Sequence, residues 1–271
     1  MDKKRNLKLT FQYDGTNFHG FQIQPEAITV QKVMETSLSG ITGEEIHITG
    51  CSRTDAGVHA IMYVCNFYTD FPIPAEKLPY VLNNKFKKEK TAIKVLGCTE
   101  VSHSFNARFD TLSKTYRYVI NNSKDTNIFT RNFEWQYSIN KLDVSKMKRA
   151  SKYIVGEKDF KSFMTAGAQV TSTVRCVNFL KITKKGDIIT IFINADGYLY
   201  NMVRIITGTL VDVGSGKIKP EAVKKIIEAQ NREMAGQTAP PEGLSLYEVI
   251  YQEETDGYKN TKQTKTAEGR A

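Results

Sequence analysis

Apolar and polar residues along the chain follow two periods, which divide it into expected strands and helices. Alternation and β-prone runs predict strands at residues 7–13, 46–49, 61–68, 91–96, 114–120, 175–183 and 187–195. Apolar residues at helical spacing predict helices at residues 30–41, 199–210 and 220–229, with Thr29 as the N-cap of the first. A short helix is expected at residues 78–82, and another is expected to end at Gly156.

The chain is long enough to bury a sizeable core. It has 271 residues, 40% of them hydrophobic, with 13 Tyr and 14 Phe. No apolar run approaches the ~20 residues that cross a bilayer, and the first residues run into a strand pattern without a signal-peptide core. We therefore expect a cytoplasmic protein without a membrane segment. Residues 252–271 are polar and lack apolar periodicity, so we expect a disordered tail there.

Charge and cysteine usage narrow the chemistry. The formal net charge of +9 favours an anionic partner, with nucleic acid the leading candidate. The four cysteines form no C-x-x-C pair and only four histidines accompany them, so we expect neither a metal site nor a disulfide framework. Cys51 has no evident paired base, and a small buried cysteine is commoner than a thiol nucleophile.

The most informative stretch is the expected loop at residues 50–60, GCSRTDAGVHA, between two predicted strands. Asp55 is its only acid. A partly shielded carboxylate stays ionised only with a cation or several N–H donors beside it, and Arg53 is a nearby candidate. The alternative is an ordinary turn, in which Asp55 binds backbone N–H groups and Gly57 supplies a positive φ.

The loop resembles the catalytic loop of the tRNA pseudouridine synthase A family, whose pattern is close to G-R-T-D-x-G-V-H-A with Asp as the catalytic residue. Ser52 stands where the family usually has Gly, a change between small residues. The resemblance implies that Asp55 is the catalytic nucleophile. Residues 13–22 are similar to the family's opening Y-D-G-T-x-Y-x-G-W-Q, although packed aromatics in a turn explain that segment equally well.

Further motifs follow in the family's order across nearly residues 7–251. Residues 105–109 resemble F-H-A-R-F with Asn106 in place of His, and residues 239–251 match the closing A-P-x-x-G-L-x-L-x-x-V-x-Y. Residues 114–118 resemble R-x-Y-R-Y, whose first Tyr, here Tyr116, lies against the target base; a core aromatic is the alternative. Residues 198–208 resemble F-L-x-H-M-V-R-N-I-V-G, which makes Arg204 the partner of the catalytic carboxylate; a surface arginine is the alternative.

The segment at residues 83–90 departs from the family. Four lysines around Phe86 replace a compact apolar turn, and they form either an extra RNA-contacting surface or a solvated face.

The resemblance implies an α+β fold of two related halves. Each half would be a mainly antiparallel sheet with helices on one face, and the active-site cleft would lie between them. We expect the N-terminal half, with the Asp loop, at residues 1–105 and the C-terminal half at residues 106–251.

The same resemblance implies conversion of uridine to pseudouridine without a cofactor or metal. The implied substrate is tRNA, in the anticodon stem-loop at about positions 38 to 40, bound largely through RNA shape and phosphates. The implied assembly is a homodimer. Arg53 and Arg204 would keep Asp55 ionised. Asp55 could attack C1′, attack the base or remove the C2′ proton, and the residues do not decide among these routes.

Two other functions remain open from the sequence. A paralogue that modifies ribosomal RNA is motivated by Ser52 and the lysine-rich segment. A catalytically idle RNA-binding protein is the second, and the joint presence of Arg53, Asp55, Tyr116 and Arg204 weighs against it. A glycosidase would need a second catalytic acid, which the pattern does not supply.

Overall fold

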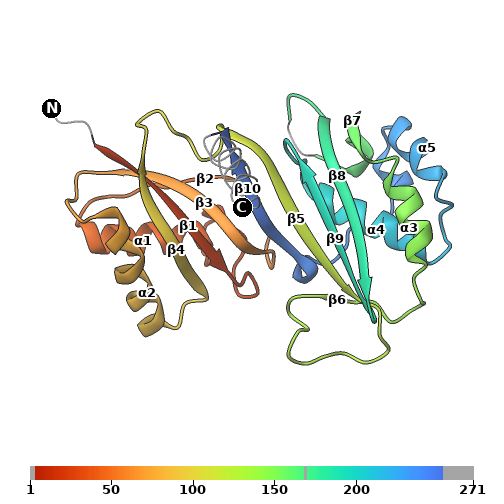
Figure 1. The fold of residues 1–271 in the computed structure, drawn as a ribbon, viewed down its shortest axis with the longest axis horizontal. Coiled ribbons are helices and arrows are strands. Elements are labelled where there is room, and N and C mark those ends of the chain that lie inside the picture. Colours follow the sequence, from red (N-terminus) through yellow and green to blue (C-terminus); the bar gives the residue numbers. More distant parts are fainter. Residues whose placement is uncertain (1–3, 168–169, 253–271) are drawn as a thin grey trace, which may run out of the picture.

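One ten-stranded sheet organises the molecule (Figure 1). The computed structural model describes residues 4–167 and 170–252, and the strand order in them is β4-β1-β3-β10-β5-β9-β8-β7, with β2 beside β3 and β6 beside β5. The strands are β1 (Arg5–Tyr13), β2 (Thr49–Gly50), β3 (His59–Thr69), β4 (Ile93–Val101), β5 (Thr111–Asn121), β6 (Trp135–Gln136), β7 (Gly156–Asp159), β8 (Val174–Lys185), β9 (Ile188–Ala195) and β10 (Leu244–Tyr251).

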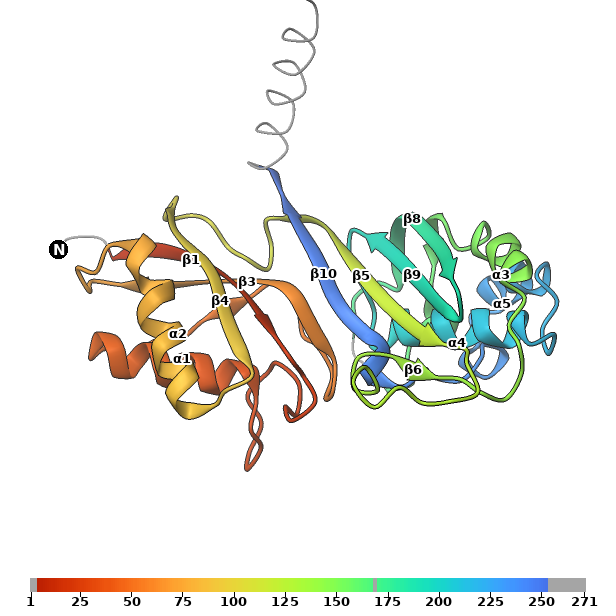
Figure 2. The same cartoon turned by 60° about the horizontal axis from the view of Figure 1, so that its bottom comes forward.

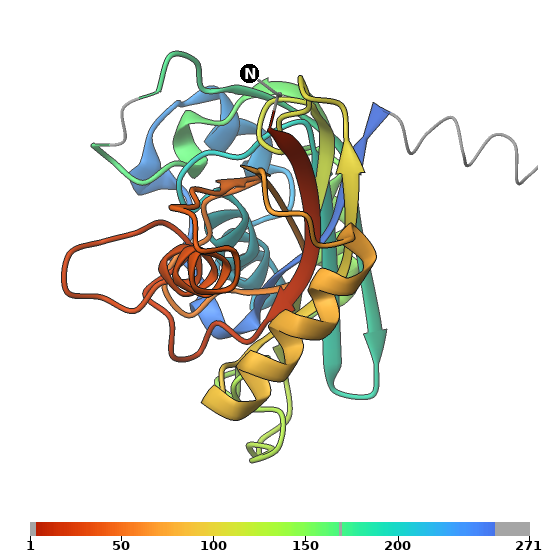
Figure 3. The same ribbon diagram turned by 90° about the vertical axis from the view of Figure 1, so that its left-hand side faces the viewer.

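The helices lie mainly on one side of this curved sheet (Figure 3). Figure 1 shows α1 and α2 near one end of the sheet and α3 to α5 near the other. They are α1 (Val30–Thr42), α2 (Leu78–Glu89), α3 (Val144–Ser151), α4 (Met202–Gly214) and α5 (Ala222–Glu228), with short 3-10 turns at Ala75–Lys77, Lys161–Phe163, Arg232–Met234 and Pro241–Gly243. The expected α+β class, with two mainly antiparallel halves and helices on one face, is confirmed.

Strand β10 joins the two halves, although it comes last in the chain (Figure 2). It runs parallel to β3, where Leu246 lies opposite Ala60, and antiparallel to β5, where the same Leu246 lies opposite Tyr116. The segment before β3 and the middle of β5 are therefore held two strands apart. That segment is the loop at residues 50–60, called the Asp55 loop below. Strand β10 therefore brings the Asp55 loop close to Tyr116.

Local sequence signals explain several elements. The alternation expected over residues 7–13 is present in β1, whose Leu7, Leu9 and Phe11 are fully buried. Thr29 caps α1 as expected, because its side chain accepts a hydrogen bond from the Lys32 N–H. The strands expected at residues 175–183 and 187–195 are present as β8 and β9, which pair antiparallel.

Helix α4 is buried on nearly all sides, because it packs between the sheet and other segments of the C-terminal half. The surface position considered for Arg204 is therefore wrong. Its side chain is only 16% exposed.

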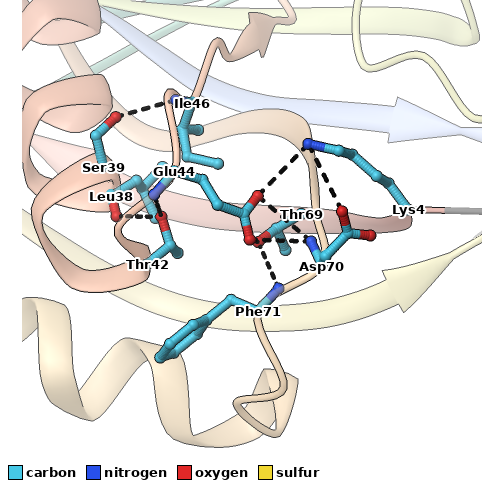
Figure 4. A network of polar contacts seen from close by, with 9 residues as sticks. All are labelled: Lys4, Leu38, Ser39, Thr42, Glu44, Ile46, Thr69, Asp70 and Phe71. Atoms are coloured by element: carbon cyan, nitrogen blue, oxygen red, sulfur yellow. Dashed lines mark hydrogen bonds and ion pairs between the residues drawn. The ribbon is translucent and has the colours of Figure 1, made fainter.

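The strand expected at residues 46–49 is wrong except for its last residue. Side chains of α1 bind this backbone instead: Ser39 Oγ accepts from the Ile46 N–H at 3.0 Å, and Glu35 Oε1 accepts from the Ile48 N–H at 3.0 Å. Figure 4 shows the adjoining network, in which Glu44 accepts from Thr69 and pairs with Lys4. These contacts tie the end of α1 to the start of β1 and the end of β3.

Helix α2 is longer than the short helix expected at residues 78–82. Leu78, Leu82 and Phe86 are spaced by four and are all buried, so one apolar stripe continues through the lysine-rich segment. Lys90, with φ +52°, ends the helix. The lysines therefore lie on the last turns of a helix and just beyond it, and one of them, Lys85, pairs with Glu89 at 2.5 Å.

The helix expected to end at Gly156 ends at Ser151. Turns close after it, with the Tyr153 N–H donating to Ala150 O and the Ile154 N–H to Ser151 O, both at 3.1 Å. Gly156, at φ +101°, begins β7 instead. The expected disordered tail lies outside the described residues, apart from residue 252.

Candidate active site

The Asp55 loop runs from the end of β2 to the start of β3 and closes in a tight turn. The Val58 N–H donates to Asp55 O at 3.2 Å, and Gly57 takes φ +76° inside this turn. The turn considered as the alternative for this segment is therefore present in the backbone, with Gly57 at a positive φ. It leaves the Asp55 carboxylate free to make other contacts.

The segment at residues 14–22 packs against this loop and forms backbone hydrogen bonds with it. The Phe21 N–H donates to Thr54 O at 3.1 Å, and Phe18 O accepts from the Gly57 N–H at 3.2 Å. Phe18 and Phe21 are buried, and the Phe21 ring stacks on Tyr63 at 4.5 Å between centroids. The packing interpretation of this motif is therefore confirmed.

Arg204 is the cation that contacts Asp55. Its Nη1 lies 3.2 Å from Asp55 Oδ2, and the two residues are 149 positions apart. Burial raises the pKa of Asp55 above its ordinary value, and the charge and hydrogen bond of Arg204 offset part of that rise. About a quarter of the Asp55 side chain (26%) remains exposed, so a substrate can reach it.

Two further hydrogen bonds fix the Arg204 guanidinium. Nε donates to Ala239 O at 2.7 Å, and Nη1 donates to Asn201 Oδ1 at 2.7 Å. Asn201 is itself held by Thr165, whose Oγ1 accepts from Asn201 Nδ2 at 2.8 Å. The guanidinium therefore has a defined position toward Asp55 before any ligand binds.

Asn201 combines this contact with an unusual backbone. It precedes α4 with φ +60°, a left-handed conformation that Asn adopts more readily than most residues. Its side chain does not cap α4 and turns to Arg204 instead.

Tyr116 lies on the same side of the sheet as this pair. Its side chain is 6% exposed, and its ring packs edge-on against Tyr198 at 4.9 Å. Its hydroxyl is 2.9 Å from Ser52 Oγ, so Ser52 links the loop to β5 through a hydrogen bond that glycine could not make. Burial raises the pKa of Tyr116, and the nearby Asp55 adds to the rise, so the phenol stays protonated near neutral pH.

Arg53 is not brought to Asp55. Its side chain is exposed, and it forms no hydrogen bond or ion pair with any residue in the described parts of the chain. The expected electrostatic support of Asp55 therefore comes from Arg204 alone in this structure. Arg53 stays beside the site, on its solvent side.

Sequence reasoning missed Asn201, Ala239 and the hydroxyl of Ser52. Asn201 lies within the helix expected at residues 199–210, so its position directly before α4 was not evident from the sequence, although Asn often lies at helix starts. The other two could not be read, because a backbone carbonyl carries no side-chain signature and the Ser52 contact depends on β10 aligning the loop with β5.

Other chemistries find little support among the described residues. Burial raises the pKa of the Cys51 thiol to about 11, which leaves little thiolate at neutral pH. No group of three or more His, Cys, Asp or Glu side chains in the described ranges could hold a metal ion. The described helices include none that is long and apolar enough to span a bilayer.

Comparison with known proteins agrees with the motifs. A family model described as tRNA pseudouridine synthase matches residues 9–110 and 150–252. The chain belongs to this family. Members of the tRNA pseudouridine synthase family are isomerases. The matched ranges contain the Asp55 loop, Arg204 and strand β10, and Tyr116 lies between the two ranges.

Individual members of the tRNA pseudouridine synthase family match along their whole length. A tRNA pseudouridine synthase A of Thermoanaerobacter sp. (strain X514) is 47% identical over 247 residues, 91% of this chain and 100% of that protein. The tRNA pseudouridine synthase A 2 of Clostridium perfringens (strain 13 / Type A) is 44% identical with the same coverage. A chain of a solved archaeal box H/ACA sRNP complex, at 12% identity and TM-score 0.33 over 82% of this chain and 60% of that chain, is too distant to add to the argument.

The position of Arg204 predicts the effect of a charge at residue 201. Asn201→Asp keeps a residue that tolerates the left-handed backbone but places a second carboxylate on the guanidinium. Arg204 then stabilises the Asp55 carboxylate less, and the new charge repels it, so the pKa of Asp55 rises further. Carbon-13 NMR titration of the Asp55 carboxyl, assigned with Asp55→Asn, should show its midpoint at higher pH than in the wild type.

Asn140→Asp is the matched control, because it makes the same charge change on an exposed side chain. It should leave the Asp55 titration unchanged. An equal midpoint in the wild type and Asn201→Asp would show that residue 201 does not act on Asp55 through Arg204.

Proposed function

We propose that this chain converts uridine to pseudouridine in the anticodon stem-loop of tRNA, at about positions 38 to 40, with Asp55 as the catalytic nucleophile. The observation that carries the proposal is the contact between Asp55 and Arg204 at 3.2 Å, beside Tyr116. Family membership gives the reaction class, and the relatives named above are tRNA pseudouridine synthases.

The reaction is an isomerisation, so atoms and electrons balance without a co-reactant. The N1–C1′ bond breaks, the uracil turns, a C5–C1′ bond forms, and C5 loses a proton while N1 gains one. An ionised Asp55 can supply an electron pair at C1′ or at the base, or can remove the C2′ proton. All three routes need the carboxylate in its charged form, which Arg204 favours.

Tyr116 and Arg53 have separate roles in this proposal. The Tyr116 hydroxyl stays protonated and is oriented by Ser52, so it can donate a hydrogen bond to the base. The target uridine must leave its helical stack to reach Asp55, which costs a few kcal/mol. Arg53, exposed and unpaired among the described residues, is placed to contact the RNA beside the displaced base.

We further propose that the protein acts as a homodimer in the cytoplasm. Support for a protein partner comes from the sheet face turned away from α3 and α4. Phe179 and Tyr247 lie on this face and remain 44% and 38% exposed. The Tyr247 ring packs against that of Phe192 at 5.2 Å between centroids. Exposed aromatic side chains grouped on a sheet face are typical of protein interfaces.

Mapping of the modified nucleotides tests the substrate. An unmodified tRNA transcript with uridines at about positions 38 to 40 is incubated with the enzyme beside a large-subunit ribosomal RNA fragment. Carbodiimide derivatisation and primer extension should report pseudouridine only in the anticodon arm of the tRNA. A transcript with cytidine at those positions is the matched control and should give no signal. Pseudouridine only in the ribosomal RNA would keep the chemistry and contradict the proposed substrate.

The raised pKa of Asp55 predicts the acid side of the pH profile. Because the ionised carboxylate is required, kcat/KM falls as pH drops through the pKa of Asp55 in the free enzyme, which burial places above the ordinary Asp value. Arg204→Met removes the cation and should move this limb to still higher pH, with a loss of about tenfold or more at neutral pH.

Arg204→Lys is the matched control, because it keeps the positive charge while losing the fixed guanidinium geometry. Its acid limb should lie between those of the wild type and Arg204→Met. Identical limbs in all three enzymes would remove the Asp55–Arg204 contact from the catalytic step.

A further inference from the structure

A cavity of about 470 Å³ lies behind the proposed active site. Its lining comes from the end of β1, the starts of β3 and β4, and side chains of β5 and β10, among them Arg117 and Ser245. Arg117 follows Tyr116 in β5, so the two side chains point to opposite faces of the sheet. The cavity is therefore on the far face from Tyr116, directly behind the end of the Asp55 loop at His59.

Arg117 lacks a partner in this cavity. Its side chain is half-buried, its Nε is fully buried, and the guanidinium forms no hydrogen bond or ion pair with the residues that the structure describes. Burial lowers the pKa of Arg117, although an arginine stays charged throughout the physiological range. A charge that is partly removed from water without a counterion is costly, so the position favours an anion.

Other arginines with restricted exposure do have hydrogen-bond partners. They are satisfied by carbonyl, hydroxyl or carboxylate oxygens: Arg5 by Glu100 and two carbonyls, Arg175 by two carbonyls, Arg204 as described above, and Arg232 by Gly236 O and Thr238. Each of these arginines therefore has protein oxygen atoms as hydrogen-bond acceptors. Arg117 instead faces a space large enough for a ligand group.

The remaining lining fits an anion with hydrogen-bonding oxygens. Lys94 adds a second positive charge, and Gln12, Thr91 and Ser245 add polar groups. His59 adds no charge, because its Nδ1 accepts from the Gly15 N–H at 2.9 Å and burial lowers its pKa.

Asp14 is the one acid among the described lining residues, and its carboxylate is already engaged. Its Oδ1 accepts from the Thr16 N–H at 2.9 Å and from the Thr16 hydroxyl at 2.5 Å. The positive charges of Arg117 and Lys94 therefore exceed the single negative charge of Asp14 in the lining. A guanidinium presents a planar fork of N–H donors that matches the oxygens of a phosphate.

We propose that this cavity binds a phosphate group of the bound RNA, outside the target nucleotide, through the guanidinium of Arg117. Phe133 lies at the cavity with 42% of its side chain exposed, its ring 4.9 Å from that of His59, so it offers a face on which a neighbouring base can stack. The RNA would then contact both faces of the sheet around the end that carries the Asp55 loop. The site requires RNA binding but no turnover, so it can fail or hold independently of the proposed catalysis.

Arg117→Met tests the proposal, with Lys181→Met as the control. Lys181 is exposed on β8 and does not line the cavity, so the control removes one positive charge from the same sheet face, two strands from Arg117. Arg117→Met should lower the affinity for an unmodified tRNA transcript by about tenfold, because it removes a charge-assisted hydrogen bond to phosphate. The slope of log affinity against log salt should flatten by about 0.7 to 0.9, the loss of one phosphate contact.

Thermal unfolding separates this loss from misfolding. In chloride buffer Arg117→Met should melt at or above the wild-type temperature, because the variant lacks an unpaired half-buried charge. Inorganic phosphate at matched ionic strength should raise the melting temperature of the wild type and Lys181→Met more than that of Arg117→Met.

Two results would overturn the proposal. The first is an RNA affinity and salt slope for Arg117→Met equal to those of Lys181→Met. The second is a change confined to self-association in sedimentation, with RNA binding unaltered, which would mean that Arg117 meets an anionic group of a second copy of this chain.

Discussion

The pairing of β10 with both β3 and β5 is the constraint on which the proposed site depends. Leu246 lies opposite Ala60 on one side and Tyr116 on the other, so one residue of the last strand sets the distance between the Asp55 loop and Tyr116. The segment that leads into β10 contributes as well, because Tyr118 donates to Pro240 O at 2.7 Å and Ala239 O accepts from Arg204. The end of the chain thus positions groups from both halves.

Two opposing effects set the protonation state of Asp55. Burial favours the neutral acid, and Arg204 favours the carboxylate. Because Arg204 is held by Asn201 and Ala239, its charge stays directed at Asp55 and is not free to turn to solvent. A raised pKa makes a carboxylate a stronger base than an exposed aspartate, and the cation favours the ionised form that the proposed reaction requires.

Local patterns predicted the elements that depend on local signals. Alternation identified β1, and the Thr29 cap identified the start of α1, because each depends on neighbours in sequence. The strand expected at residues 46–49 was wrong because Ser39 and Glu35 of α1 bind that backbone, which alternation cannot reveal. The length of α2 was underestimated because the lysines concealed the continuing stripe that ends at Phe86.

The site was predictable to the extent that motifs carry it. The motifs drew attention to Asp55, Tyr116 and Arg204, and the structure brings these three together. The motifs named Arg204 as the partner of the carboxylate, but we also expected Arg53 to support Asp55. Arg53 is closer in sequence, yet its side chain is exposed and forms no contact with Asp55. The role of Arg117 was also hidden, since its lack of a partner among the described residues depends on five strands meeting at one cavity.

The central claim is that Asp55 performs isomerisation of uridine in tRNA. The most direct measurement is tritium release from tRNA labelled at uracil C5, with wild-type enzyme and Asp55→Asn side by side. The account predicts release by the wild type and none by Asp55→Asn, whose tRNA affinity should stay within about fivefold of the wild type because one small group changes. Tritium release by Asp55→Asn at a rate near that of the wild type would contradict it.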